Sequence, residues 1–311
     1  MKIYNIKLGT SLDIPNINLA IGNFDGIHLG HQKIIKELIN NSVANQARPA
    51  ILSFKPHPRQ FFSGNYNNFN IITENSKISL LKQLGIEYYF CLEFDYSIAS
   101  LTPEKFITEI LIKQLNTKNL IVGYNFRFGK DRLGDVNLLK EQSENNNFGL
   151  KVINPIKYNS TLEVFSSSLI RKNIQSGNFG KVNNWLGRKW SMSGTVILGD
   201  KRAGKINFPT ANLIPPSDLI HPKKGVYAVK IKNGNNLYDG VANFGNRPTV
   251  DGTKLLLEAH LFEFNQDIYG NDLTVEFLAF IRDEKKFGNF ALLTEQIHKD
   301  IQIAKNYHSN N

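Results

Sequence analysis

Residues 21–38 read IGNFDGIHLGHQKIIKEL, and this stretch decides how the first half of the chain is interpreted. The apolar run INLAI at 17–21 predicts a buried strand, and the residues from 31 onward place apolar side chains at helical spacing. The stretch is therefore expected to be a strand-to-helix turn. The first N–H groups of a helix have no partner within the helix, so they favour an anion at such a turn.

Two histidines occupy this turn. His28 and His31 lie about one helical turn apart, so both can face one phosphate and donate hydrogen bonds to a phosphorus-centred transition state. Gly22, Gly26 and Gly30 let a phosphate chain approach the backbone closely. An H-x-x-H pair alone is also typical of a weak metal pair or of ordinary surface histidines, although no third ligand is evident nearby.

The amino-acid composition limits the class of protein to which the chain can belong. The chain has 311 residues, enough for two domains, and its 41% hydrophobic and 21% charged content is typical of globular proteins. No apolar run is long enough to span a membrane, no secretory signal is evident, and the single cysteine fits a reducing cytoplasm. The net charge of +10 favours anionic partners, but the lysines form no block, which disfavours nucleic acid.

The first half alternates between strand-like and helix-like segments. Such alternation predicts an α/β domain, Rossmann-like, with a parallel sheet covered on both faces and ligands at the carboxyl ends of its strands. We expect this domain to span residues 1–187. The strands are expected at 17–22, 49–54, 88–94, 119–126 and 150–156, and the helices at 31–47, 76–85, 102–115 and 135–147.

The second half, residues 188–311, has a different pattern. Short apolar runs separated by Gly, Asn and Asp turns predict a small antiparallel β-barrel. The runs lie at 194–200, 225–232, 236–245, 254–264 and 273–282. A final amphipathic segment places Leu293, Ile297, Ile301 and Ala304 on one face, which predicts a terminal helix packed on the barrel.

Three further segments of the first half carry unusual polar groups. Residues 54–62, FKPHPRQFF, form a loop that two prolines hold extended. Residues 122–135, VGYNFRFGKDRLGD, gather Asn125 and Arg127 with two phenylalanines that could stack on a flat ring or belong to the core. Residues 165–177, FSSSLIRKNIQSG, offer a serine helix cap and an arginine in the first turns, which is also an ordinary arrangement.

In the second half, residues 208–212 read FPTAN. Thr210 and Asn212 would point to one side of an extended segment, and their hydroxyl and amide oxygens suit Mg²⁺ held with nucleotide phosphates. Asn243 lies beside a glycine turn. Glu258 and His260 share a face of an alternating strand, where a carboxylate can serve as a general base or be merely solvated.

These first-half segments together resemble the N-terminal domain of the bacterial bifunctional riboflavin kinase/FMN adenylyltransferase family. The family pattern G-x-F-D-G-x-H-x-G-H, F-x-P-H-P, G-x-x-F-x-F-G and S-S-T/S-x-I-R is matched in order, with Lys55 where an acidic residue is common and Ser168 where threonine is usual. The resemblance implies catalytic roles for His28 and His31, and a flavin-binding loop of Pro56, His57 and Pro58. The nucleotide-binding residues that it implies are Gly22, Phe24, Asp25, Gly30, Asn125, Arg127, Ser167, Ser168 and Arg171.

The second half resembles the riboflavin kinase domain of the same family. Its motifs F-P-T-A-N, G-V-Y, N-x-G-x-x-P-T and L-E-x-H-L-F are all present, whereas Lys205 and Asn207 replace the usual arginine and glycine. The resemblance implies Glu258 as the base for the ribityl hydroxyl, and Mg²⁺ bound through Thr210 and Asn212. The nucleotide-binding residues that it implies here are Gly199, Lys205, Pro209, Thr210, Asn212 and Asn243.

The expected function is therefore two consecutive transfers from ATP: riboflavin to FMN in the second domain, and FMN to FAD with release of pyrophosphate in the first. Mg²⁺ would serve both, and no nucleic acid, membrane or obligatory protein partner is expected. Two alternatives remain: another H-x-G-H nucleotidylyltransferase with an unrelated barrel, which would not phosphorylate riboflavin, and a basic RNA-binding barrel, which would show salt-sensitive nucleic-acid affinity.

Overall fold

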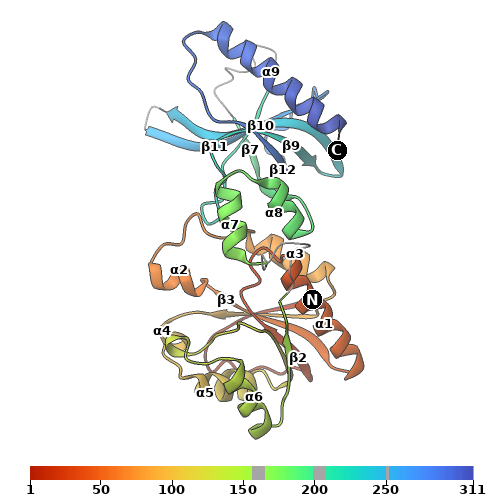
Figure 1. Cartoon of the computed structure of the whole chain (residues 1–311), viewed down its shortest axis with the longest axis vertical. Helices are drawn as coiled ribbons and strands as arrows, with labels where there is room; N and C mark the ends of the chain where they lie inside the picture. The colour runs from red at the N-terminus through yellow and green to blue at the C-terminus, as the bar shows by residue number, and fades with distance from the viewer. Residues whose placement is uncertain (156–164, 199–207, 250–251, 311) are drawn as a thin grey trace. The chain divides into compact units, whose positions relative to one another are not determined.

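The computed structural model describes residues 1–155, 165–198, 208–249 and 252–310. The chain packs into two compact units, coloured along the sequence in Figure 1. The first comprises Met1–Tyr66 and Thr73–Ser167, and the second comprises Asn67–Ile72 and Ser168–Asn311. Packing thus divides the chain after Ser167, earlier than the boundary we expected at residue 187.

A six-stranded parallel sheet forms the centre of the first unit, as the alternating pattern predicted. Its strand order is β1-β4-β3-β2-β5-β6. The strands are β1 (Lys2–Ile6), β2 (Ile17–Ile21), β3 (Arg48–Lys55), β4 (Tyr88–Glu93), β5 (Thr117–Gly123) and β6 (Gly149–Ile153). The edge strand β1 was not predicted, because only its last residue is buried and its apolar pattern is weak.

Helices cover both faces of this sheet. On one face Leu19 and Phe90 belong to a core that includes Phe106 and Leu139, whereas on the other Asn18 donates to Asn41 of α1 at 2.9 Å. The helical segments are α1 (Leu29–Ala44), α2 (Pro58–Ser63), α3 (Glu74–Gln83), α4 (Tyr96–Ala99), α5 (Pro103–Lys105), the π-helical η1 (Phe106–Gln114), the 3₁₀ turn η2 (Lys130–Arg132) and α6 (Val136–Asn145).

The strand order fixes where a ligand can bind to this sheet. The chain runs from β2 outward through β3 to β4 on one side, and continues in β5 and β6 on the other side of β2. Because β2 and β5 are neighbours whose following connections diverge, the general rule for open parallel sheets places a ligand at their carboxyl ends. The histidine turn follows β2, and the loop with Asn125 follows β5.

The second unit contains a closed antiparallel barrel, which confirms the fold expected for the second half. Its strand order is β10-β11-β8-β7-β12-β9. The strands are β7 (Trp190–Ile197), β8 (Ala211–Leu213), β9 (Gly225–Asn233), β10 (Asn236–Thr249), β11 (Gly252–Leu261) and β12 (Asp272–Arg282). The helices are α7 (Ser167–Gln175), α8 (Phe179–Leu186) and α9 (Phe290–Ser309), and α7 begins at the last residue of the first unit.

The barrel has an aromatic interior and a partly covered exterior. Inside, Phe179 of α8 contacts Trp190, Tyr227 and Phe277 with ring centroids 5.0–5.5 Å apart. Outside, Ala304 of α9 is buried in a small core with residues of β9 and β10, and α9 runs along the barrel in Figure 1. The terminal helix is therefore present and packs on the barrel as predicted.

The 67–72 segment interrupts the first unit and is built into the second. The Asn70 side chain donates to Asp218 at 3.1 Å, and the Trp190 indole N–H donates to the Ile71 carbonyl at 2.7 Å. The Arg171 Nε donates to the Phe69 carbonyl at 2.8 Å, and its guanidinium lies 4.0 Å from the centroid of the Phe69 ring. The second unit thus depends on a strap from the first half of the sequence.

In the described part of the chain, none of the helices has the length and apolar character needed to cross a membrane.

A buried asparagine joins α8 to two barrel strands. Asn183 donates to the Phe277 carbonyl at 2.9 Å and accepts from the Trp190 N–H at 2.7 Å. We predict that Asn183→Ala lowers the free energy of unfolding by about 1–3 kcal/mol for each buried backbone group left without a partner. Thermal or denaturant unfolding measures this loss, and Asn184→Ala, at an exposed position of the same helix, should cost much less.

Candidate functional site

The strand-to-helix turn of the first unit brings its two histidines together. The His28 and His31 rings stack with centroids 3.7 Å apart and planes 18° apart. His28 is the N-cap of α1, and its Nδ1 accepts from the His31 backbone N–H at 3.3 Å. The turn is tightly bent, since Phe24 and Ile27 both have positive φ. Both imidazoles therefore lie at the amino end of α1, where the helix dipole favours an anion.

A side chain at position 30 would crowd the His28 ring. A Cβ on residue 30 would lie 3.0 Å from both Cε1 and Nδ1 of that ring. Asp25 and Phe24 of the same turn are buried, and the Asp25 carbonyl accepts from the Ser167 hydroxyl at 2.9 Å. Gly22 has space for a side chain only if the Phe24 ring moves, because a Cβ there would lie 3.3 Å from its Cε2.

The proline-flanked loop after β3 ends in α2. His57 is the N-cap of this helix, and its Nδ1 accepts from the Arg59 N–H at 3.0 Å. Pro56 and Pro58 flank it, as the sequence indicated.

Exposed aromatic rings follow this loop, and the sequence analysis missed them. Phe62 of α2 is 70% exposed and Tyr96 of α4 is 81% exposed. Phe61 contacts both rings, at centroid distances of 5.3 and 4.9 Å. The signal was available, because the motif FKPHPRQFF ends in two phenylalanines on a helix too short to bury both.

The loop after β5 carries Asn125 and Arg127. Arg127 is exposed and forms an ion pair with Asp135 at 3.2 Å. Phe128 was a candidate for stacking on a ligand ring, but it is 6% exposed and belongs to the core beside Phe106. That interpretation of Phe128 is wrong, because Gly134 leaves the space into which its ring packs: a Cβ there would lie 2.8 Å from the ring.

The serine-arginine motif is divided between the two units. Ser167 belongs to the first unit, whereas Ser168 and Arg171 belong to the second. Arg171 is 9% exposed and holds Phe69 of the strap described above.

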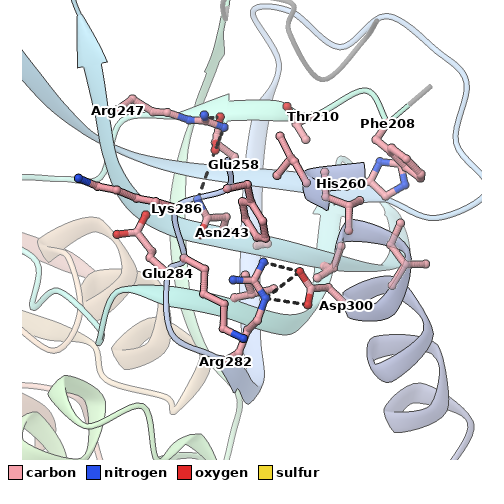
Figure 2. A pocket seen from close by; sticks show the side chains of 18 of the residues that line it. Phe208, Thr210, Asn243, Arg247, Glu258, His260, Arg282, Glu284, Lys286 and Asp300 are labelled. Atoms are coloured by element: carbon pink, nitrogen blue, oxygen red, sulfur yellow. Dashed lines mark hydrogen bonds and ion pairs between the residues drawn. The ribbon is translucent and has the colours of Figure 1, made fainter. Parts of the chain in front are cut away.

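A pocket of about 880 Å³ lies on the outer face of the barrel, against α9 (Figure 2). Strand alternation explains why: Ala211, Leu257 and Phe244 point into the barrel and are buried, so their neighbours point outward. The outward positions of β9, β10 and β11 line the pocket, together with apolar residues of α9. Leu293, Ile297 and Ile301 thus line a cavity as well as pack.

Three polar residues form a row across adjacent strands of this face. In the strand register Glu258 of β11 is paired with Asn212 of β8 on one side and with Asn243 of β10 on the other. Asn212 is 7% exposed, and its Nδ2 donates to the Thr210 carbonyl at 3.3 Å. The structure thus brings together Thr210, Asn212, Asn243 and Glu258, which lie up to 48 positions apart in the sequence.

The Glu258 carboxylate accepts hydrogen bonds from two residues: Asn243, which belongs to the row, and Arg247, which lies beyond it. The Arg247 Nε donates to Oε1 at 2.9 Å, and the Arg247 Nη2 donates to Oε2. Asn243 Nδ2 donates to Oε2 at 3.4 Å. The Glu258 side chain is 11% exposed and faces the pocket, as Figure 2 shows.

A second ion pair borders the pocket and fastens α9. Arg282 of β12 donates to Asp300 through Nε at 2.8 Å and Nη2 at 2.6 Å, and Gln296 donates to the same carboxylate at 2.9 Å. The Asp300 side chain is 5% exposed. Such a buried pair positions the helix, because removing either partner would leave an uncompensated charge.

His260 lies next to Glu258 on the same strand face. Its Nδ1 is 2.8 Å from the Pro209 carbonyl, which ties the FPTAN segment to β11. Burial lowers the pKa of His260 and the charge of Lys305 lowers it further, while the Pro209 carbonyl opposes the shift. Burial likewise lowers the pKa of His221, with a contribution from Lys224.

The predicted residues Gly199 and Lys205, together with Asn207, lie outside the described residues. In the ranges described, no three His, Cys, Asp or Glu side chains gather closely enough to hold a metal ion. The oxygens of Thr210 and Asn212 are nevertheless hard donors. Since Mg²⁺ usually takes only one or two protein oxygens beside phosphate and water, this donor set fits it.

Two protein-family models match the chain. The FAD synthetase model matches residues 12–168, and the riboflavin kinase model matches residues 186–308.

Relatives and a solved structure match the chain over nearly its full length. The bifunctional riboflavin kinase/FMN adenylyltransferase of Buchnera aphidicola subsp. Schizaphis graminum is 38% identical and covers 98% of this chain and 97% of its own. The protein of the same name from Bacillus subtilis is 36% identical and covers 94% of this chain and 92% of its own. A crystal structure from Streptococcus pneumoniae that is called a macrolide-efflux protein is 28% identical in sequence. It covers 98% of this chain and 99% of its own, with a TM-score of 0.88.

The two lowered histidine pKa values predict a pH dependence of stability. Between the lowered native values and the ordinary value of about 6.5, the unfolded chain binds more protons than the native one. The free energy of unfolding should therefore fall as the pH drops below about 6.5. His260→Gln should make this fall less steep in denaturant titrations at several pH values.

Proposed function

We propose a division of labour between the two units of a chain that belongs to the bifunctional riboflavin kinase/FMN adenylyltransferase family. A member of this family phosphorylates riboflavin to FMN and adenylylates FMN to FAD, using ATP in both steps. We assign the first step to the barrel pocket and the second to the carboxyl edge of the parallel sheet. The observation that carries the assignment is the row of Asn212, Glu258 and Asn243 across adjacent strands, of which Glu258 and Asn243 line the pocket.

Glu258 is the base of the kinase step. Its carboxylate accepts the proton of the terminal ribityl hydroxyl as that oxygen attacks the γ-phosphorus of ATP, and the bond from the γ-phosphorus to the bridging oxygen breaks to release ADP. The carboxylate is nearly buried and faces the pocket, so a hydroxyl bound there meets it directly. The apolar residues of α9 suit the flat flavin ring on the opposite side of the pocket.

Thr210 and Asn212 would hold Mg²⁺, and Pro209, Asn243, Gly199 and Lys205 would contact the nucleotide. The ion would neutralise charge on the phosphates during transfer. Support comes from the oxygen donors of Thr210 and Asn212 beside Glu258, and from the hydrogen bond that anchors Pro209 to His260.

His28 and His31 serve the adenylyl transfer. A phosphate oxygen of FMN attacks the α-phosphorus of ATP, the bond from the α-phosphorus to the bridging oxygen breaks, and pyrophosphate leaves. The stacked imidazoles would donate hydrogen bonds to the negative charge that grows on the phosphorus-bound oxygens. Nucleotide contacts would come from the turn and the later loops, through Gly22, Phe24, Asp25, Gly30, Asn125, Arg127, Ser167, Ser168 and Arg171.

Pro56, His57 and Pro58 would bind the flavin of FMN in the first unit. The exposed Phe62 and Tyr96 near them offer the flat apolar surface that an isoalloxazine ring needs. Since ATP, FMN and the products carry phosphate, small polyanions account for the +10 charge, and we propose no nucleic-acid, membrane or obligatory protein partner for this cytoplasmic chemistry.

Two variants separate the steps. We predict that His28→Ala converts riboflavin to FMN but makes little FAD, because only the second unit's chemistry survives. Glu258→Gln should fail on riboflavin yet adenylylate supplied FMN. The measurement is chromatographic separation of flavins after incubation with ATP and Mg²⁺; equal loss of both steps in both variants would contradict the two-site assignment.

Gly30→Ala perturbs the histidine stack without removing either imidazole. The added methyl group would lie 3.0 Å from the His28 ring and displace it from His31. We predict a drop of about 10- to 100-fold in FAD formation from FMN, within the range attributed to such positioned groups, with FMN formation unchanged. Gly180→Ala, whose Cβ would meet nothing closer than 4.0 Å, is the matched control.

A further inference from the structure

Arg247 is the described group that contacts Glu258 most closely, and the roles assigned so far leave it unused. Both residues lie on the β10–β11 hairpin, where Arg247 is paired with Lys254 and Asn243 is paired with Glu258. Arg247 therefore reaches back along the strand by four positions to meet the carboxylate. Gly245, between Arg247 and Asn243 on the same face, has no side chain to stand in the way.

The geometry of this contact is a fork. Nε meets Oε1 and Nη2 meets Oε2, so one edge of the guanidinium engages both carboxylate oxygens at once. A fork of this kind fixes the plane of the carboxylate, which a single donor cannot do. Asn243 and Arg247 both donate to Oε2, whereas Oε1 keeps a second lone pair, so a substrate hydroxyl can still donate to Oε1.

The other charged groups at the pocket do not replace Arg247. Arg282 is engaged by Asp300, across the pocket on β12 and α9. The Glu284 carboxylate lies over Gly245, where a Cβ would come within 1.8 Å of its Oε1, and Lys286 of the same loop lines the pocket. His260 on β11, Asn212 on β8 and Asn243 on β10 complete the polar surroundings of Glu258.

We propose that Arg247 is the positioning residue of the kinase site, holding the Glu258 carboxylate in the plane that accepts the ribityl proton. This inference rests on the proposed role of Glu258. In the transfer, the proton moves from the hydroxyl to a Glu258 oxygen, the alkoxide oxygen bonds to the γ-phosphorus, and ADP departs with the electron pair of the broken bond. The proton on Glu258 then passes to solvent, which restores the carboxylate.

A phosphate-binding role for Arg247 makes a different prediction. An arginine that binds ATP changes the KM for ATP, whereas an arginine that orients the base changes kcat. The guanidinium edge that faces Glu258 is occupied in the fork, so a phosphate would have to displace the carboxylate from it. The KM-against-kcat split therefore decides between the two roles.

The test measures riboflavin phosphorylation by the full chain with ATP and Mg²⁺. For Arg247→Gln we expect kcat to fall by about 10- to 100-fold, with the KM for ATP changed less than about twofold. Arg247→Lys should recover part of the loss, because it keeps the charge without the fork. Lys286→Gln removes a cation from the same pocket and should lower kcat much less.

Internal controls separate the two possible failures. FAD formation from supplied FMN reports whether the rest of each variant is intact, because it uses the other unit. If wild type makes FMN and Glu258→Gln does not, the proposed function stands, and a raised KM for ATP with an unchanged kcat in Arg247→Gln overturns the positioning role alone. If Glu258→Gln phosphorylates riboflavin normally, the assignment of the base fails, and the role of Arg247 fails with it.

Discussion

The strand that closes the barrel, β8, is only three residues long. Ala211–Leu213 of β8 pair with β11 on one side, and two of the three pair with β7 on the other. Ala211 and Leu213 fill the interior, so Asn212 faces outward beside Glu258. A slip of one residue would turn Asn212 inward and bury an unpartnered amide, so the apolar core specifies the register that assembles the site.

The first unit obtains its site by a different constraint. Its strand order places the expected ligand position at the carboxyl ends of β2 and β5, and the backbone must bend sharply there to turn from strand to helix. Phe24 and Ile27 accept positive φ in this turn, and burial of both side chains offsets the strain. The bend leaves His28 as the helix cap, with its ring against His31. Core packing thus holds a geometry that the local sequence disfavours.

The sequence predicted those parts of the structure that periodicity or a short motif encodes. Strand-helix alternation predicted the parallel sheet, and the spacing of His28 and His31 predicted two imidazoles on one turn. The pairing of Arg247 with Glu258 was missed, because it depends on the register of a hairpin whose turn length no periodicity reveals. The strand β8 was missed because three residues are too few for their alternation to predict a strand. The sequence left open whether Phe128 stacks on a ligand or belongs to the core, because a glycine six positions away makes its core site.

The units of packing differ from the units of sequence similarity. The FAD synthetase model spans residues 12–168, yet the 67–72 segment within it bonds to Asp218, Trp190 and Arg171 of the second unit. This segment connects α2, which follows the flavin loop, to α3. The conformation of that connection is therefore set by residues of the second unit. A chain cut between the two matched ranges would lose Trp190 and Asp218, so this connection depends on both matched ranges.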